Sequence, residues 1–184
     1  MKNQRGMTLL EVMMAVSVGS ILVAVGVPSF VSTVRNSEMT SAANGMVGAL
    51  YAARSEAVKR RTRVTLCRST TGTSGPECSA TGDEIAVFMN VANDTTIDTA
   101  NGDIVIQSLK WLPDTIDVTS DDVPDAFSFN ASGFTRAQAG GTVSGDVLFC
   151  GPRGDEGARV LTLAPTGRPL IRKQADVSGG PSCT

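Results

Sequence analysis

The sequence predicts an α+β protein in which one long amino-terminal helix precedes a β-rich domain. Residues 7–31 form an almost uninterrupted apolar run, long enough for a helix that crosses a bilayer. Apolar residues then recur at helical spacing up to about residue 61. Beyond that point the pattern changes to short alternating runs between turn residues, which is typical of strands. A chain of 184 residues has room for one domain beyond such a helix.

The apolar run contains one charged residue, Glu11, between Met7 and Phe30. A carboxylate in a membrane helix costs roughly 2.5–3.5 kcal/mol on insertion scales, so Glu11 is expected to have a partner and a role. Lys2 and Arg5 precede the run and orient its amino terminus towards the cytoplasm. Two simpler interpretations, a cleaved secretory signal peptide and a plain membrane anchor, leave Glu11 unexplained.

The residues Arg5-Gly6-Met7-Thr8-Leu9-Leu10-Glu11, followed by the apolar helix, resemble the class III signal of type IV pilins and type II secretion pseudopilins. The resemblance implies that prepilin peptidase cuts between Gly6 and Met7 and then N-methylates Met7, where the family usually has Phe. It also implies that Glu11 neutralises the α-amino group of a neighbouring subunit when the helices stack into a filament. One helical turn separates Met7 from Glu11, so both can face the same side.

The resemblance extends to Pro28, which matches the proline that family members place near the end of the buried part of the helix. Proline removes one backbone donor, so a kink or a locally melted turn is expected there. A second helical stretch is then expected from about Ser32 to Arg61. Its apolar stripe consists of Met39, Ala43, Met46, Leu50, Ala53 and Ala57. Gly45 and Gly48 weaken this helix by up to about 1 kcal/mol each relative to Ala, and would permit another backbone to approach.

The segment Ala53-Arg54-Ser55-Glu56-Ala57-Val58, followed by Val64-Thr65-Leu66-Cys67, is similar to the GspH/FimT subfamily of minor pseudopilins and minor pilins. The implied organisation is a leader at 1–6, a transmembrane and filament-core helix at 7–31, an amphipathic half at 32–61 and a β-rich periplasmic head at 62–184. The implied location is the bacterial inner membrane, crossed once, and then a fibre. The implied partners are prepilin peptidase, other pilin or pseudopilin subunits through the amino-terminal helix, the inner-membrane assembly platform and the membrane.

Strands in the head are predicted from alternation and turn residues. They are expected near Arg63–Arg68, Ile85–Asn90, Ile104–Leu109, Thr115–Val118, Ala126–Asn130, Asp146–Cys150, Arg159–Ala164 and Pro169–Lys173. Residues 69–82 are rich in Thr, Ser and Gly and contain Pro76, so a loop is expected there. The end of the helix before the first strand is the most basic part of the chain, and cations suit a helix carboxyl terminus.

Four cysteines beyond a membrane anchor predict an oxidising compartment and two disulfides, with three pairings possible. Cys67 and Cys78 bracket the expected loop and lie eleven positions apart, so closing that loop is the economical pairing. Cys150 and Cys183 remain, and their bridge would tether the carboxyl-terminal tail to a strand end. Each bridge is expected to contribute about 2–4 kcal/mol of stability.

The composition gives little support for catalysis or for a bound group. The chain has no His, which is the usual general base, and it contains neither a Ser-x-x-Lys nor a Gly-x-Ser-x-Gly pattern. The acidic group Asp94, Asp98, Asn101 and Asp103 departs from the spacing of a calcium-binding EF-hand and is typical of turns. We therefore expect no enzymatic activity, no cofactor and no metal.

A basic cluster near the carboxyl terminus is a candidate site for DNA binding. Related FimT-type pilins bind DNA through a Gly-Arg-x-Arg tail, whereas here Gly167-Arg168 is followed by Pro169 and Leu170. Arg168, Arg172 and Lys173 are the candidate phosphate contacts. The even separation of the two arginines places them on one face of an extended strand. A solvated edge strand with protective charges is the preferred interpretation.

The resemblance implies that the protein is a minor pilin or pseudopilin that assembles into, or primes, a type IV pilus or a type II secretion pseudopilus. The alternative function is capture of DNA during natural transformation, through the basic carboxyl-terminal strand.

Overall fold

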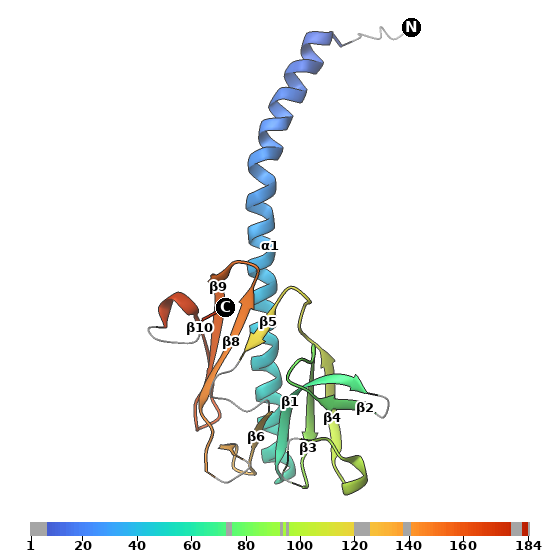
Figure 1. Ribbon diagram of the computed structural model, residues 1–184, viewed down its shortest axis with the longest axis vertical. Coiled ribbons are helices and arrows are strands. Elements are labelled where there is room, and N and C mark those ends of the chain that lie inside the picture. The colour runs from blue at the N-terminus through green and yellow to red at the C-terminus, as the bar shows by residue number, and fades with distance from the viewer. Residues whose placement is uncertain are drawn as a thin grey trace. The chain divides into compact units, whose positions relative to one another are not determined.

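The computed structural model describes residues 7–72, 75–92, 94, 96–119, 126–137, 141–177 and 182–183. The chain divides into two compact units, Met1–Ser37 and Glu38–Thr184. Helix α1 spans Leu9–Arg60 and contributes residues to both units (Figure 1). The second unit, called the head from here on, contains the carboxyl-terminal part of α1 and two antiparallel sheets.

Both ends of α1 are closed by local hydrogen bonds. At the start, the backbone N–H of Glu11 donates to Thr8 Oγ1 at 3.3 Å, which makes Thr8 the N-cap. At the end, Arg61 takes a left-handed conformation with φ of 53°, and the N–H of Thr62 donates to the carbonyl of Ala57 at 3.2 Å. These are the features of a Schellman motif, which satisfies the last carbonyl groups of a helix.

The sequence predicts a kink or a locally melted turn at Pro28, and the melted turn is wrong because α1 continues through this residue. Proline lacks the N–H that would donate to the carbonyl of Ala24, but it removes only this one bond. The hydroxyl groups of Ser32 and Thr33 both donate to the carbonyl of Ser29, at 2.7 and 3.1 Å, in the turn that follows. The two helical stretches expected from the sequence are therefore one helix.

The larger sheet has the strand order β4-β3-β1-β6-β7, with β2 paired to the outer part of β1 (Figure 1). Its strands are β1 (Val64–Gly72), β2 (Gly75–Cys78), β3 (Glu84–Met89), β4 (Ile104–Lys110), β6 (Ala126–Phe129) and β7 (Thr135–Arg136). The smaller sheet has the order β10-β9-β8-β5. Its strands are β5 (Asp117–Thr119), β8 (Gly145–Gly151), β9 (Gly154–Leu163) and β10 (Pro169–Lys173). Two 3-10 helices, η1 (Thr99–Asn101) and η2 (Gln174–Asp176), complete the described elements.

The loop expected at residues 69–82 is largely wrong, because β1 continues to Gly72 and pairs with β2 in a hairpin. Thr70 and Thr71 are β-branched and suit a pleated strand, which outweighs the turn composition of the segment. Pro76 is tolerated in β2, since β2 is paired only with β1 and proline is compatible with an edge strand. Strand β7 also lay outside the expectation, because two residues are too few to show alternation.

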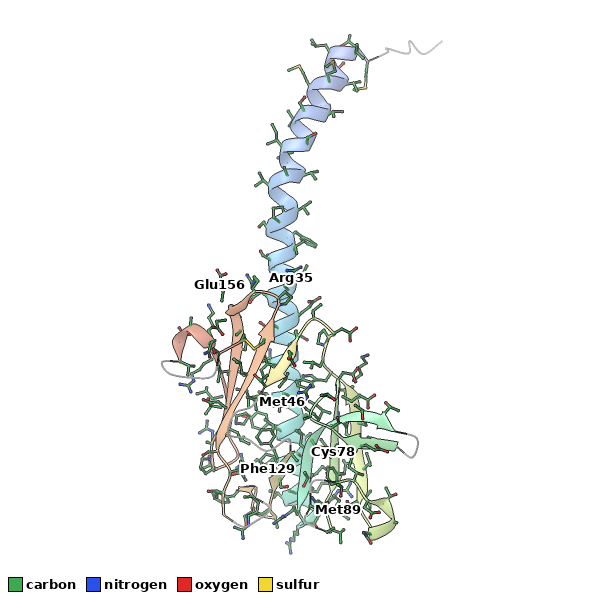
Figure 2. The ribbon with its side chains drawn as sticks, in the orientation of Figure 1. Arg35, Met46, Cys78, Met89, Phe129 and Glu156 are labelled. Atoms are coloured by element: carbon green, nitrogen blue, oxygen red, sulfur yellow. A yellow bond between two sulfur atoms is a disulfide. The ribbon has the colours of Figure 1, made fainter. Side chains whose placement is uncertain are left out.

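The core of the head lies between α1 and the two sheets. Every residue of the predicted apolar stripe of α1 is buried. The stripe belongs to one hydrophobic cluster with residues of both sheets: Val64, Leu66, Phe127, Phe129, Phe149, Leu161 and Leu163. Figure 2 labels Met46 on α1 and Phe129 on β6, two members of this cluster. Even spacing along each strand selects the residues that face α1, as the pleat requires.

Trp111 packs against α1 at a position that only glycine leaves open. Its indole N–H donates to the carbonyl of Ala42, and its ring meets Phe149 edge-on at a centroid distance of 5.8 Å. A Cβ atom at Gly45 would come within 2.6 Å of Cδ1 of Trp111. Gly48, one turn further on, is exposed and has no atom within 4 Å of such a Cβ. From the sequence, both glycines would permit another backbone to approach α1. In the structure the close contact is at Gly45 alone, and the group that approaches is the side chain of Trp111.

The two glycines give a matched pair of substitutions. Gly48→Ala is expected to raise the free energy of unfolding by up to about 1 kcal/mol, because Ala is the better helix former. Gly45→Ala is expected to lower it by about 1–3 kcal/mol, since the new methyl group overpacks the indole. Denaturant unfolding followed by the fluorescence of Trp111 measures both. Equal stabilisation by the two substitutions would contradict the packing of Trp111 on Gly45.

Candidate functional site: the amino-terminal helix and the basic strand

The part of α1 that precedes Glu38 exposes an apolar surface on all sides. Among the described residues, α1 is the one helix long and apolar enough to cross a membrane, and none of its most apolar stretch is buried. The large exposed side chains include Leu9, Leu10, Met13, Met14, Val16, Ile21, Leu22, Val25 and Phe30. Soluble monomers rarely expose a continuous apolar patch of this size, so lipid or other helices are expected to cover it.

The serine hydroxyl groups of this segment donate hydrogen bonds to carbonyl groups of their own helix. Ser17 Oγ donates to the carbonyl of Met13 at 2.8 Å, and Ser20 Oγ donates to the carbonyl of Val16 at 2.7 Å. Such bonds to the preceding turn let a hydroxyl group enter hydrocarbon without an unpaired donor. The serines therefore do not require partners from another chain.

Glu11 differs from the serines because its carboxylate has no partner among the residues that the structure describes. No hydrogen bond or ion pair joins this carboxylate to any other residue of the described ranges, and the side chain is exposed. Its place in the first turn is favourable, since a negative charge interacts well with the amino-terminal end of the helix dipole. Met7 lies one turn away and is also exposed. This geometry can accept a cation brought by a second chain. Gly6, the other residue of the expected cleavage site, lies outside the described residues.

Thr8 is a residue of this segment whose role the sequence analysis missed. Thr8 and Glu11 have the spacing of a capping box, in which a Ser or Thr cap is followed three residues later by Glu or Gln. This Thr-x-x-Glu spacing is the feature of the sequence from which Thr8 could have been predicted as the N-cap of the helix. The structure shows the half of the box in which Thr8 Oγ1 accepts the N–H of Glu11.

The structure joins the cysteines in the two pairs expected from the sequence. Cys67 on β1 is bonded to Cys78 on β2, with Cα atoms 5.7 Å apart, and this bond closes the β1–β2 hairpin. Cys150 on β8 is bonded to Cys183 in the tail, with Cα atoms 5.6 Å apart. The N–H of Cys183 also donates to Asp155 Oδ1 at 2.7 Å. No cysteine is free within the described ranges.

The basic candidates do not form one cluster. Arg168 lies in the turn before β10, whereas Arg172 and Lys173 lie at the far end of that strand. Adjacent residues of a strand point to opposite faces, so Arg172 and Lys173 diverge. Arg172 Nη2 also donates to Thr162 Oγ1 at 3.0 Å on β9, and Leu170 is exposed on the same face as Arg172. Strand β10 is an edge strand, where charged side chains protect against unwanted pairing.

The presence of glycine at position 167 is explained by the backbone conformation of a turn and does not depend on DNA binding. Its φ is +75°, and its N–H donates to the carbonyl of Ala164 at 2.8 Å in a tight turn. A Cβ atom at this position would also come within 2.6 Å of the carbonyl oxygen of Gly133. The glycine of the Gly167-Arg168 pair is therefore required by the turn.

The acidic turn group is held by local hydrogen bonds. Asp98 Oδ1 accepts the N–H of Ala100 at 2.9 Å at the start of η1. The buried Asp103 accepts the N–H of Val91 at 2.8 Å and that of Asp98 at 3.0 Å. These carboxylates order the loop between β3 and β4, as Asp commonly does in turns.

Replacing Arg168, Arg172 and Lys173 together by Gln tests the DNA alternative. We expect the purified chain to bind duplex DNA weakly or not at all, because Arg172 and Lys173 lie on opposite faces of β10 and Arg172 already bonds Thr162. If they do contact phosphate, the triple variant flattens the dependence of log K on log salt by about 0.9 per lost contact. Salt-sensitive binding at about micromolar protein, abolished by the triple change, would overturn this expectation.

Comparisons with known proteins identify the family. The prokaryotic N-terminal methylation motif matches residues 1–27, and the family described as type II transport protein GspH matches residues 42–167. Two crystal structures of the type IV minor pilin FimU from Pseudomonas aeruginosa share the fold, with TM-scores of 0.54 and 0.57 at 17% and 18% identity. They cover 77% and 78% of this chain and 98% and 95% of their own lengths. No curated protein matches the chain. Because the GspH match spans more than half of the sequence and the methylation motif precedes it, the chain belongs to the GspH family of pilin-like proteins.

Proposed function

We propose that the chain is a minor subunit of a type IV pilus or of a type II secretion pseudopilus. It is held in the inner membrane with its amino terminus in the cytoplasm and its head in the periplasm. Prepilin peptidase removes residues 1–6 and methylates Met7, and the subunit then enters or primes the fibre. The observation that carries this proposal is the carboxylate of Glu11, which has no partner within the described ranges and lies at the start of an exposed apolar helix.

The transfer from membrane to fibre follows from the chemistry of the helix. In the bilayer, Glu11 is the one unfavourable group of the apolar run and costs roughly 2.5–3.5 kcal/mol. In a bundle of stacked helices, the same carboxylate meets the positive α-amino group of a neighbour, and the apolar surface exchanges lipid for protein. Each charge offsets the desolvation of the other, so assembly removes the cost that membrane residence imposes.

The head is suited to a structural role outside the cytoplasm. Its two disulfides close a hairpin and fasten the tail, and such bonds persist in an oxidising compartment. We propose no catalytic step, because the chain has no His and the described residues contain no cluster of metal-ligating side chains. DNA capture stays a separate alternative, with the triple Gln variant as its test.

Recovery of the chain from purified fibres tests the proposal. The full-length chain with a carboxyl-terminal epitope is expressed in its own host, and surface fibres are sheared off and probed for the epitope. Deletion strains for the pilus assembly platform and for the secretion assembly platform serve as matched controls. We expect the chain in fibres of the wild type and its loss in one of the two deletion strains, which identifies the machine. Retention in the membrane fraction alone, with unchanged pili and unchanged secretion when the gene is deleted, would contradict the proposal.

A further inference from the structure

The head has two ends that lie far apart along α1. The end at which α1 enters the head is called the proximal end, and the end at which α1 stops is called the distal end (Figure 1). Met39 lies against Gly151, where β8 ends, and Val58 lies against Gly133, in the turn between β6 and β7. At a rise of about 1.5 Å per residue, the stretch of α1 between these two contacts spans roughly 28 Å.

Cations outnumber acids at the distal end. The cations are Arg54, Lys59, Arg60, Arg61, Arg63 and Arg136, with Arg168 in the turn whose Gly167 meets Gly133. The acids are Glu56, Asp94, Asp98, Asp103 and Asp146. Glu56 is paired with Lys59 and Arg60, and the three Asp between β3 and β4 accept backbone N–H groups. The surface beside the end of α1 is therefore positive.

Arg61 is the cation of this end whose position the fold does not explain. It is exposed and forms no hydrogen bond or ion pair with any other residue of the described ranges. Its φ of 53° is left-handed, where glycine has no steric cost and is the usual residue of a Schellman motif. The chain thus keeps a cation where glycine would give a more stable helix end, and strain of this kind points to a function.

The proximal end contains an acidic pocket of about 670 Å³. Its polar walls are the carboxylates of Asp114 and Asp117 and the hydroxyl groups of Thr115 and Thr119, and the Cys150–Cys183 bridge supplies an apolar wall. Asp117 Oδ1 accepts a backbone N–H at 2.8 Å, and Asp114 forms no hydrogen bond or ion pair with another described residue. Both carboxylates can therefore accept further donors.

The charge around the pocket is also negative. The other acids of the proximal end are Glu38, Asp83, Glu84, Asp155 and Glu156, and its cations are Arg68, Lys110 and Arg153. Lys110 is paired with Asp83 at 2.9 Å, and Arg68 donates to the carbonyls of Gly82 and Val118.

The pocket suits an organic cation better than a metal ion. The described residues contain no group of three side chains that could hold a metal. A guanidinium has five donors in one plane, which suit two carboxylates and the hydroxyl groups beside them. The methylene stem of an arginine can pack on the apolar wall.

We propose that Arg61 of one copy enters this pocket in a second copy and pairs with Asp114 and Asp117, so that heads stack distal end on proximal end. The two surfaces are complementary in charge but too far apart to meet within one chain. Like ends repel each other, which disfavours a two-fold dimer through either end. A contact between unlike ends leaves one surface of each kind free, so it continues into a row of subunits. The place of this contact in a fibre rests on the proposed function.

Zero-length cross-linking of the full-length chain in detergent tests the contact. A carbodiimide joins a lysine amine to a carboxylate that it touches, so Arg61→Lys supplies a reactive amine and keeps the charge. Isotopically labelled chains are mixed with unlabelled ones, which separates links between chains from links within one. We expect mixed-isotope peptide pairs that join position 61 to Asp114 or Asp117. Their yield is expected to fall in about 1 M salt, where the screening length is about 3 Å.

Arg60→Lys is the matched control for this cross-link. Its amine lies one residue away from position 61, but Glu56 already holds the side chain at this position. We expect a link to Glu56 of the same chain and none to the pocket. Absence of mixed-isotope links from position 61 to the pocket, or links from position 61 to the distal end of the second chain, would overturn the proposal.

Arg61→Gly separates the contact from a structural role of Arg61. The substitution relieves the left-handed strain, so it is expected to raise the denaturant midpoint of the chain. Self-association in detergent, measured by sedimentation, is expected to weaken about tenfold or more, because a charge-assisted bond is lost. Unchanged self-association would contradict the contact.

A mixture of two variants tests whether unlike ends meet. Arg61→Gln removes the cation, and Asp114→Asn with Asp117→Asn neutralises the pocket, all at exposed positions that leave the core intact. Each variant alone is expected to lose self-association. The mixture is expected to form pairs and no longer rows, because each variant keeps one of the two surfaces. A mixture that does not associate would overturn the proposal.

These experiments are independent of the proposed function, because chains in detergent do not need to form a fibre. Cross-linking by a chain that fails to enter fibres would sustain the contact and reject the fibre. Undiminished entry of the Arg61→Gly chain into fibres, without cross-linking of the Arg61→Lys chain, would do the reverse.

Discussion

Glu11→Ala is expected to lower recovery of the chain in sheared fibres by at least about tenfold while its level in the membrane stays the same or rises. The two effects have one cause. Removing the carboxylate relieves the membrane-inserted monomer of roughly 2.5–3.5 kcal/mol. It also leaves the α-amino group of the neighbour unpaired in the fibre, and loss of one partner of a buried charge pair costs about 2–5 kcal/mol. Both changes shift the equilibrium away from the fibre. Immunoblots of the membrane and fibre fractions measure the ratio.

Ser17→Ala is the matched control for Glu11→Ala. Its hydroxyl lies in the same apolar segment but bonds the carbonyl of Met13 within its own helix. Its replacement is expected to leave the fibre fraction unchanged. Normal recovery of the Glu11→Ala chain in fibres would show that Glu11 does not pair with a neighbour's amine.

Loss of either disulfide is expected to lower the free energy of unfolding of the head by about 2–4 kcal/mol. Replacing Cys150 and Cys183 by Ala is expected to cost about 1 kcal/mol more than replacing Cys67 and Cys78. The reason is that the first bridge spans 33 residues and the second spans 11, and the entropy of loop closure grows with the logarithm of length. Denaturant unfolding followed by the fluorescence of Trp111 measures both, since Trp111 is the only tryptophan in the chain.

Peptide mapping without reduction checks the premise of the stability comparison. It should recover the Cys67–Cys78 and Cys150–Cys183 bridges as separate fragments. A cross-link from Cys67 to Cys150 or to Cys183 would contradict the pairing. Full stability of a reduced chain would contradict the contribution assigned to the bridges.

Features that depend on neighbouring residues could be predicted from the sequence. The stripe of α1 could be predicted because apolar residues recur at spacings of three and four at six positions from Met39 to Ala57, and all six are buried. The pairing of Cys67 with Cys78 could be predicted because a hairpin brings near neighbours together. Strands β1, β3, β4, β5, β6, β8, β9 and β10 each overlap an expected run, although several ends differ.

Features that depend on tertiary register could not be predicted. The contact between Trp111 and α1 joins residues 69 positions apart, and glycine spacing alone could not show which of Gly45 and Gly48 receives it. The alignment of Thr65, Ser128 and Arg136 across the larger sheet depends on the pairing of β1 with β6 and of β6 with β7. Strand β7 has only two residues and no periodicity to detect. At Pro28 the expected melted turn was wrong, because one missing hydrogen bond does not interrupt a helix of 52 residues.

The identity of the mature amino terminus tests the central claim most directly, since every step of the proposed assembly depends on processing between Gly6 and Met7. The chain is purified from membranes of its own host, digested and analysed by mass spectrometry. The account predicts an amino-terminal peptide that begins at Met7 and carries one methyl group on its α-amine. A mature chain that begins near Pro28 would contradict it, because the apolar helix and Glu11 would then have been removed as a secretory signal peptide.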